Sequence, residues 1–453
     1  METIHFYHTN DVHSHFENWP QMSRFLCDKK REHLTNGEAC YVVDIGDYVD
    51  RSHPFTEGTN GQGNIRLLNE AGFDAVTIGN NEGITMSQEA LSSLYKDAKF
   101  KVIVGNLFEQ DGERPSWALP YTIYVTGQGT RIGVIGATAQ YTTFYSKLGW
   151  EVTSPRQELK RIAKSIVGET DLVVCLSHMG ITEDEKLAME CPEIDVLFGA
   201  HTHHLFHEGK LVGDTLLAAT GKYGEYVGHV TVHVDVQAKK VMDMTAELYR
   251  SDQLTRTEED IQQVNALIES GKQAMAEKVF YNSEPLPQNL FGPSPLASFF
   301  GRALIAYTQA DCALFNAGIF LGGLEKGWVT RESLHTLLPH PINPCIITLD
   351  GTELLEIYEL SLNEEWPRIE IKGLGFRGTL MGAMMHERLY KNRHGKLYAG
   401  NREVVSGQAY TVATLDMFTF GFFFPSFQQA KKDYCMPELI RDVLGWYGME
   451  LNK

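Results

Sequence analysis

The sequence predicts an α/β protein with two domains: an N-terminal domain in which helices cover two packed β-sheets (four layers, α-β-β-α), and a smaller C-terminal α/β domain. Three observations lead to this prediction. Apolar runs typical of buried strands, such as residues 4–7, 41–45 and 172–176, alternate with helical patterns in the first half. A series of β-like segments follows, between residues 215 and 249. A polar helical stretch and a Pro-rich segment then separate this half from the rest of the chain.

The helical stretches of the first half include one with clear start signals. Residues 155–167 follow Ser154, a residue type that caps helices, and begin with a proline, whose fixed φ suits the first helical position. Residues 19–33 and 88–98 also have helical patterns. We expect these helices to lie outside the two sheets.

The boundary between the domains is predicted within residues 251–284. Residues 255–279 form a long, largely polar amphipathic pattern, and such a helix often bridges domains rather than filling a core. The expected organisation is a first domain over residues 1–250, a bridging helix and linker over 251–284, and a second domain over 285–453.

Polar residues that can bind metals follow the predicted strands in five separate fragments. The fragments read YHTNDVHSH, VVDIGDYVD, VTIGNNEG, CLSHMG and FGAHTHH. One such fragment would mean little, but five at strand ends are improbable by chance, so we predict a single metal centre. The candidate metal ligands are Asp11, His13, Asp47, Asn80, His178, His201 and His203.

These residue types suit a pair of divalent ions that act on a phosphoryl group. Two ions about 3.5–4 Å apart can clamp a phosphoryl group and generate a hydroxide between them. Asp47 is the predicted bridging ligand, because two neighbouring cations need a shared anion. Neutral imidazoles and an amide oxygen favour borderline metals such as Mn, Zn, Co or Fe. One ion is expected to bind Asp11, His13, Asp47 and His203, and the other Asp47, Asn80, His178 and His201.

The five fragments resemble those of the calcineurin-like metallophosphatases, and within them the 5′-nucleotidase/UDP-sugar hydrolase family. The resemblance extends into the second half, where NAGIFLGGLEKGWVT, LLPHPINP and VATLDMFTFGFFFP occupy the places of the family's substrate-domain motifs. It implies a substrate-binding C-terminal domain, with Asn316 as a substrate contact and Phe424 in the place of a family aromatic residue. Phe376 and Arg377 are candidates for base stacking and phosphate binding; the alternative is a core ring and a surface cation in a Gly-rich turn.

The chain departs from the family where a catalytic His–Asp dyad is expected. The family's N-H-E motif reads N-N-E at residues 80–82, and Ile84 stands where the family has the aspartate. Three interpretations are open: His53 or His204 supplies the missing function, the leaving group needs little protonation, or the protein binds metal and nucleotide with little hydrolysis. The first two are favoured. Asn81 can still donate a hydrogen bond to a phosphoryl oxygen.

Composition limits the possible partners. The 40 Lys and Arg residues against 58 Asp and Glu residues give a net charge of −18, which argues against binding a nucleic-acid polymer. The beginning of the sequence has no secretory signal pattern, and no apolar run approaches the length of a membrane span. The seven cysteines, several of them in apolar runs, are expected to be reduced. We therefore expect a cytoplasmic protein that does not bind membranes.

Other polar residues near the candidate ligands have expected supporting roles. Asp44 and His15 are expected to orient ligands, and His5 and His8 to be strand or supporting residues. Two roles are open for Glu82: a carboxylate that supports a loop, which is at least as well indicated, and a catalytic acid. The Gly-rich residues 57–64 are interpreted either as a loop on the catalytic face or as a surface turn.

Together these features predict a metal-dependent phosphohydrolase with two divalent ions, in which Asp47 and Asn81 take part in catalysis. The expected substrates are small nucleotide-like esters or anhydrides: nucleoside monophosphates, UDP-sugars, cyclic nucleotides or dinucleotides. Loss of the dyad favours diesters and anhydrides slightly. The alternative is a nucleotide- or metal-binding regulatory protein derived from such a hydrolase, with little turnover.

Overall fold

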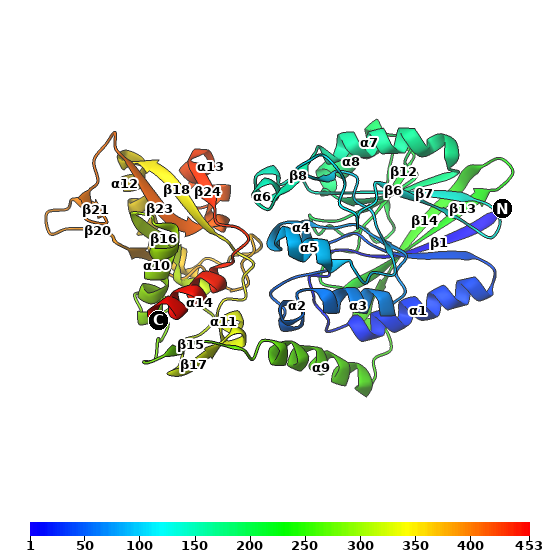
Figure 1. Ribbon diagram of the computed structural model, residues 1–453. Helices are drawn as coiled ribbons and strands as arrows, with labels where there is room; N and C mark the ends of the chain where they lie inside the picture. The colour runs from blue at the N-terminus through cyan, green and yellow to red at the C-terminus, as the bar shows by residue number, and fades with distance from the viewer. The chain divides into compact units, whose positions relative to one another are not determined.

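The chain folds into two compact units. A computed structural model describes all residues 1–453 and divides into Met1–Gly271 and Lys272–Lys453, shown with their secondary structure in Figure 1. The first unit contains every candidate metal ligand. Each unit has its own sheets and its own core.

The first unit is built on two six-stranded sheets. The first sheet has the order β14-β13-β1-β2-β3-β4, with bounds Lys240–Arg250, Tyr226–Asp235, Glu2–Thr9, Ala39–Asp44, Ala75–Val76 and Lys101–Val102. The second has the order β11-β12-β10-β9-β7-β6, with bounds Lys210–Val212, Thr215–Ala218, Val196–Gly199, Leu172–His178, Arg131–Thr138 and Tyr121–Val125. β1, β2, β3 and β4 run parallel, as do β7, β9, β10 and β12. The carboxyl ends of the parallel strands of each sheet therefore meet at one edge.

The two sheets pack face to face around a single apolar core. Ile4 and Val43 of the first sheet share this core with Val134, Val174 and Val196 of the second. Because side chains alternate along a strand, the neighbours of these residues point away from the core toward the covering helices.

Helices cover the outer face of each sheet (Figure 1). The second sheet packs against α7 (Pro155–Ile166) and α8 (Ile181–Glu190) in a second apolar core. The first packs against α1 (Trp19–Thr35), whose Phe25 contacts the rings of Tyr7 and Tyr249. The predicted four-layer α-β-β-α arrangement is therefore confirmed.

Two local predictions need correction. The helix predicted at 155–167 begins after Ser154, but that side chain makes no capping hydrogen bond. The Gly-rich segment at 57–64 is not an open loop: it contains the end of α2 (Pro54–Gly58) and the start of α3 (Gln62–Glu70). Gly61 separates the two helices with φ +76°, a left-handed conformation that glycine adopts without strain. The loop interpretation was wrong because glycine here separates two helices.

The other short elements of the first unit connect the sheets and helices. They are α4 (Asn80–Thr85), α5 (Gln88–Leu94), β5 (Leu107–Glu109), α6 (Thr142–Lys147) and β8 (Trp150–Val152). α4 follows β3 directly, so its first turn lies at the same sheet edge as the candidate ligands.

A helix, α9 (Glu258–Ala274), lies within the predicted linker region, and the division between the units falls within it. Its N-terminal part is tied to the first unit, because the guanidinium of Arg24 binds the Asp260 carboxylate at 2.7 and 2.9 Å. Gly271 packs against the backbone of Pro54 and Phe55 so closely that a Cβ would lie 2.3 Å from the Phe55 nitrogen.

The second unit is a smaller α/β fold around a five-stranded sheet. The sheet has the order β19-β16-β23-β18-β24, with bounds Met384–Glu387, Cys312–Asn316, Ala409–Leu415, Pro344–Asp350 and Lys431–Tyr434. Two small sheets accompany it: β15-β17 (Lys278–Asn282, Gly327–Thr330) and β20-β21-β22 (Leu389–Lys391, Leu397–Ala399, Arg402–Glu403). The helices are α10 (Pro295–Thr308), α11 (Arg331–Leu337), α12 (Gly351–Ser361), α13 (Pro425–Gln429) and α14 (Ile440–Leu451).

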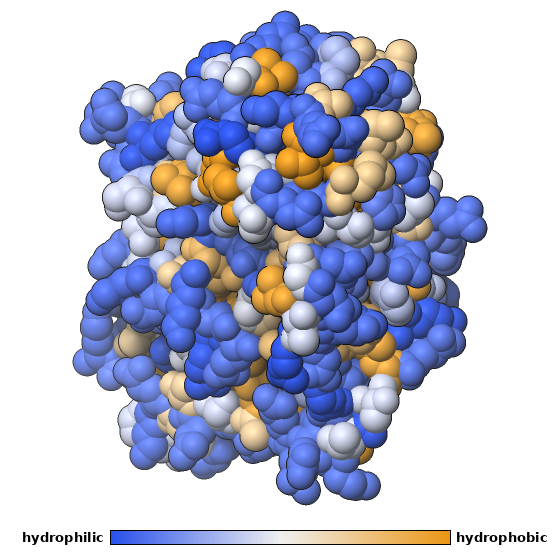
Figure 2. Space-filling model, turned by 90° about the vertical axis from the view of Figure 1, so that its right-hand side faces the viewer, coloured by the Kyte–Doolittle hydropathy of each residue, from blue (hydrophilic) through white to orange (hydrophobic).

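Hydrophilic residues predominate on the face of the molecule in Figure 2, and apolar residues occur there singly or in small groups. No helix combines the length and the apolar character needed to cross a lipid bilayer.

Candidate metal centre

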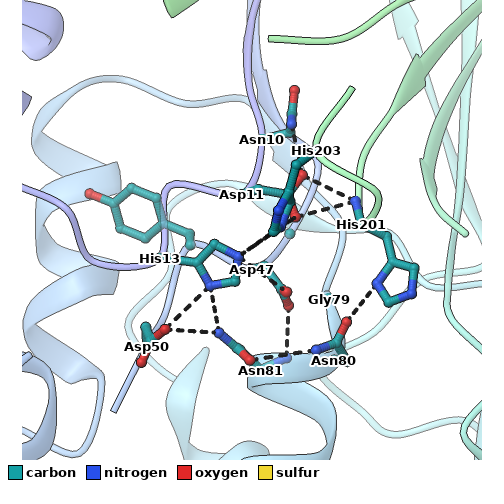
Figure 3. A network of polar contacts seen from close by, with 12 residues as sticks. Asn10, Asp11, His13, Asp47, Asp50, Gly79, Asn80, Asn81, His201 and His203 are labelled. Atoms are coloured by element: carbon teal, nitrogen blue, oxygen red, sulfur yellow. Dashed lines mark hydrogen bonds and ion pairs between the residues drawn. The ribbon is translucent and has the colours of Figure 1, made fainter. Parts of the chain in front are cut away.

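The candidate ligands lie at the carboxyl ends of parallel strands in both sheets of the first unit. Asp11 and His13 follow β1, Asp47 follows β2, Asn80 opens α4 after β3, His178 ends β9, and His201 and His203 follow β10. Figure 3 shows six of the seven side chains gathered in one place. The packing of the two sheets brings these segments together.

Asp47 lies at the middle of the group. Its Oδ2 is 3.7 Å from Nε2 of His13 and 3.5 Å from Nε2 of His178. His13 and His203 approach each other with 3.3 Å between their Nε2 atoms, and Nε2 of His203 is 3.5 Å from Oδ1 of Asp11. A carboxylate with imidazoles on two sides has the geometry of a bridging ligand.

His201 and Asn80 form the other side of the centre. Nδ1 of His201 lies 2.8 Å from Oδ1 of Asn80, and the His201 backbone N–H donates to the Asp11 carboxylate. The hydroxyl of Tyr141 lies 3.2 Å from Nε2 of His201. The rings of His178 and His201 are neighbours, with centroids 5.3 Å apart.

These residues fit divalent metal ions. Two groups, Asp11–His13–His203 and Asp11–Asp47–His178, each have one potential ligand atom per residue within 4.8 Å of the others. Nδ1 of His178 lies 2.7 Å from the carbonyl oxygen of Ile45, which aims Nε2 into the centre, where it is buried without a hydrogen-bond partner. A histidine whose second nitrogen is held in this way is typical of metal ligands. Asp11 belongs to both groups, whereas the assignment made from the sequence gives it to one ion only.

The ionisation of these side chains reflects their mutual charges. Burial opposes the charged form of Asp47, but His178 and His13 outweigh it, so the pKa of this carboxyl lies below its ordinary value. Burial also opposes the charged form of His178, but Asp47 and Asp11 raise the pKa of this imidazole to about 10. Burial, aided by the charge of His178, lowers the pKa of His201 to about 4. The carboxylates of the centre are therefore anionic and lie next to the imidazole of His178. A metal ion would replace the positive charge of that imidazole.

Five of the seven candidate ligands have a backbone conformation that is rare for residues other than glycine. Asp11, His13, Asp47, His201 and His203 have φ between +50° and +74°. Each such residue costs about 1–3 kcal/mol, and such conformations concentrate at functional sites. Gly79 also permits a close approach here, because a Cβ on it would lie 2.0 Å from Oδ1 of Asp47.

Asn81, in the place of the family's catalytic histidine, contacts the centre with both backbone and side chain. Its backbone N–H donates to Oδ1 of Asp47 at 2.7 Å. Its side-chain nitrogen lies 2.7 Å from Nδ1 of His13 and 3.3 Å from Oδ2 of Asp50 (Figure 3). The amide therefore orients His13, one of the candidate ligands.

Sequence reasoning missed two residues of the site. Asp50 lies 3.3 Å from Nδ1 of His13, and Tyr141 contacts His201. The position of Asp50 three residues after Asp47 was a weak signal, since both lie in the loop after β2. No pattern in the sequence pointed to Tyr141, because it comes from the segment between β7 and α6.

Two carboxylates support the loops that carry the ligands. Glu82 accepts hydrogen bonds from the backbone N–H groups of Asp47, Val49 and Gly79 at 2.8–3.0 Å. This geometry agrees with the supporting interpretation of Glu82, not with that of a catalytic acid. Asp44 accepts from the Thr9 hydroxyl and the Gly46 N–H, as expected for a supporting group.

The two histidines considered as replacements for the missing dyad contact other groups. His53 caps α2, with Nδ1 accepting from the Phe55 N–H, and its ring packs on Phe16. His204 lies against Phe206, with Nδ1 3.1 Å from the Thr202 hydroxyl.

The four predicted substrate contacts lie in the second unit, and most of their side chains are buried there. Phe376 stacks on His340, and Phe424 packs among other rings with no exposed surface. Asn316 is also fully buried: its amide donates to the Met381 carbonyl, while its Oδ1 has no hydrogen-bond partner. The Arg377 side chain reaches the Phe376 carbonyl. Their roles as substrate contacts stay predictions.

A two-sheet α-β-β-α domain with aspartates and histidines at its strand ends defines a metallophosphoesterase. The family model described as calcineurin-like phosphoesterase matches residues 4–205, which include all seven candidate ligands. A relative from Bacillus subtilis, the uncharacterized metallophosphoesterase YunD, is 39% identical over 98% of this chain and 99% of its own length. The chain therefore belongs to the calcineurin-like phosphoesterase family.

Solved structures with the same two-part fold include two nucleotidases. One is a 5′-nucleotidase precursor from Thermus thermophilus, which aligns with 99% of this chain and 97% of its own at a TM-score of 0.61 and 19% identity. The other is the NAD nucleotidase of Haemophilus influenzae, with 99% and 96% coverage, a TM-score of 0.65 and 14% identity. Members of this family are hydrolases that use divalent metal ions, so this chain is a metal-dependent hydrolase.

Proposed function

We propose that this protein is a dinuclear-metal phosphohydrolase that acts on small nucleotide-like phosphate esters or anhydrides. The observation that carries the proposal is the convergence of seven candidate ligands from five segments around Asp47. We assign one ion to Asp11, His13, Asp47 and His203, and the other to Asp47, Asn80, His178 and His201. The ions would be Mn, Zn, Co or Fe. When bound, they would polarise the phosphoryl group and activate a water molecule for attack on phosphorus.

The protein's own contribution is to hold this centre in place and to exclude water from its carboxylates. Asp47 and Asp11 are almost fully buried, so their charges act in a medium of low dielectric constant. Asn81 orients His13, and Glu82 fixes the loop that carries Asp47. Catalysis then depends on prearranged charge at the phosphoryl group rather than on a proton donor at residue 81.

The absence of an imidazole at residue 81 favours substrates with good leaving groups. The Asn81 amide cannot deliver a proton as a histidine can, and it already contacts His13 and Asp50. His53 and His204 contact other residues. We therefore infer a preference for pyrophosphate bonds, cyclic phosphates or aryl esters over simple 5′-monophosphates.

The names of related proteins support a nucleotide-like substrate. The two nucleotidases share this chain's fold over nearly its whole length, including the second unit. We propose that the second unit binds the nucleoside part of the substrate, with Asn316 as the first residue to test. Its buried Oδ1, which has no partner, could accept a hydrogen bond if substrate binding exposed it.

A cytoplasmic location is part of this proposal. None of the seven cysteines forms a disulfide, and five of them are buried. Seven cysteines outside disulfides are typical of proteins that function in a reducing compartment. Fractionation of the source cells would test the location directly.

A substrate screen tests the proposed function. Metal-stripped protein is reloaded with Mn, Zn, Co or Fe and given nucleoside monophosphates, UDP-glucose, 2′,3′-cyclic nucleotides and an aryl phosphodiester. Product chromatography should show turnover of the anhydride, cyclic or aryl substrates that exceeds turnover of 5′-monophosphates. A preference for 5′-monophosphates would overturn the leaving-group inference, and no turnover with any bound metal would overturn the proposal.

A further inference from the structure

A second cluster of histidines lies on the other face of the first sheet, away from the phosphoesterase centre. His5 of β1, His33 in the last turn of α1 and His229 of β13 meet between that helix and the sheet. One potential ligand atom of each lies within 4.8 Å of the others. Glu38, just before β2, completes the group: its Oε2 is 2.8 Å from Nδ1 of His33 and 3.3 Å from Nε2 of His5.

The outer nitrogens of two of these rings are held by neighbouring groups. Nδ1 of His229 is 2.9 Å from the Glu247 carboxylate, which leaves its Nε2 directed into the cluster. Nε2 of His33 is 3.1 Å from the Tyr7 hydroxyl, which leaves Nδ1 directed toward Glu38. An imidazole whose second nitrogen is fixed by a carboxylate or hydroxyl has the orientation of a metal ligand.

The hydrogen bonds of the cluster cannot all be satisfied with neutral rings. His229 donates from Nδ1 to Glu247, so its Nε2 accepts from Nδ1 of His5, 3.0 Å away. Nε2 of His5 then has no proton, yet it lies 3.3 Å from a carboxylate oxygen of Glu38. That nitrogen is buried and has no hydrogen-bond partner. Two acceptors facing each other require a cation between them or a proton on His5.

The rings of His5 and His33 are stacked with centroids 3.6 Å apart, so positive charges on both rings would repel each other, whereas neutral rings would not. Neutral imidazoles are the form that binds metals.

We propose that His5, His33, His229 and Glu38 bind one divalent transition-metal ion of the zinc type, at a site separate from the phosphoesterase centre. Three imidazoles and one carboxylate make a four-coordinate set that suits zinc. Ligand atoms around tetrahedral zinc lie about 3.3 Å apart, and Oε2 of Glu38 lies 2.8 Å from Nδ1 of His33 and 3.3 Å from Nε2 of His5. Nε2 of His229 faces Nδ1 of His5, so the rings would have to turn for both histidines to bind the same ion.

Solvent can reach the site through its carboxylate. The Glu38 side chain is 37% exposed, whereas those of His5 and His229 are each 8% exposed. Glu38 and Glu247 also make the entrance negative, and the carbonyl groups at the end of α1 favour a cation there. The ion would join the end of α1 to β1 and β13, so it is expected to stabilise the packing of this helix on the sheet.

The test counts the metal ions bound per chain, with Zn²⁺ and Co²⁺ as the probes. Stripped protein is dialysed against each metal, and bound metal is measured by mass spectrometry. His5→Gln and Glu38→Gln should each bind one equivalent less than the unaltered chain and should lose the absorption of a four-coordinate Co²⁺ site. His233→Gln is the matched control, because His233 lies on the same face of β13 but outside the cluster, against Thr3. Glu38 is partly exposed, so its variant removes a ligand without opening the core.

Equal metal content in the unaltered chain and in both ligand variants would overturn the proposal, and so would equal loss in the His233→Gln control. Titration of His5 by NMR without any response to Zn²⁺ would also overturn it, since the cluster would then bind only a proton. The measurement is a difference of one equivalent, so it does not depend on whether the phosphoesterase centre turns over any substrate.

Discussion

The side-chain nitrogen of Asn81 lies 2.7 Å from Nδ1 of His13, on the side of the ring opposite Asp47 and His203. The residue that replaces the family's catalytic histidine thus contacts a candidate metal ligand. Asp50, 3.3 Å from the same His13 nitrogen, shares this role. We propose that residue 81, where the family's motif has a histidine expected to act on the substrate, acts in this chain through His13.

Replacement of Asn81 by alanine should lower both metal affinity and turnover. Groups that orient a metal ligand typically contribute about 10–100-fold. We expect kcat/KM for the best substrate to fall within that range and part of the loss to be recovered by excess metal, because His13 itself remains. Steady-state kinetics over a metal titration would measure this. Asn401→Ala, at an exposed turn, is the control. A loss of activity that no metal concentration relieves would mean that Asn81 acts on the substrate.

Replacement of Asp47 by alanine should abolish metal-dependent turnover. Oδ2 of Asp47 lies within 4 Å of Nε2 of both His13 and His178. Its loss should remove at least one of two bound ions and lower kcat/KM by at least about 100-fold. Metal content and activity measured on the same preparation would check both effects, with the exposed Asp28→Ala as control. Retention of most of the activity would contradict the assignment of the centre.

Replacement of Glu82 by glutamine should destabilise the loop after β2 without removing a ligand. The carboxylate accepts three backbone hydrogen bonds, and an amide would place N–H groups against at least one of these donors. A buried donor left unsatisfied costs about 1–3 kcal/mol. Urea unfolding of metal-stripped protein should show a loss of that size. Glu89→Gln, on the exposed face of α5, provides the comparison, and equal stability of the two variants would refute the prediction.

The stability of the second unit should fall as the pH rises from about 4 to about 7. Burial raises the pKa of the Asp416 carboxyl from 3.8 to about 7, although the Asn343 N–H favours its charged form. In this window the folded chain keeps a proton that the unfolded chain has released, so the free energy of unfolding decreases with pH. One pKa unit corresponds to about 1.4 kcal/mol.

Asp416→Asn should remove this pH dependence, because an amide oxygen can still accept from Asn343 but carries no charge. Hydrogen exchange of the β23 amides at pH 5 and pH 8 would show the effect. At pH 8 the variant should be more protected than the unaltered chain, and at pH 5 the difference should be smaller. Greater protection of the unaltered chain at pH 8 would contradict the assigned direction.

Much of the first unit was predictable because strands and ligands follow local rules. Apolar runs marked β1, β2 and β9, and the polar residues that follow them were recognisable as candidate ligands before any contact was known. The segment at 57–64 was misread because glycine is compatible with both a loop and a helix boundary. Asp50 and Tyr141 escaped notice because only packing brings them to His13 and His201.

The sequence by itself determined the four-layer architecture, the family that its five motifs resemble, and a set of candidate metal ligands. These features depend on residue type and on order along the chain, which are present in the sequence before any tertiary contact is known. Tertiary structure alone decided that Asn81 contacts His13, that Glu82 supports a loop, and that three histidines from α1, β1 and β13 meet behind the sheet. Those contacts join segments as far as 224 residues apart, and only strand pairing and the packing of helices and loops on the sheets bring them within hydrogen-bond distance.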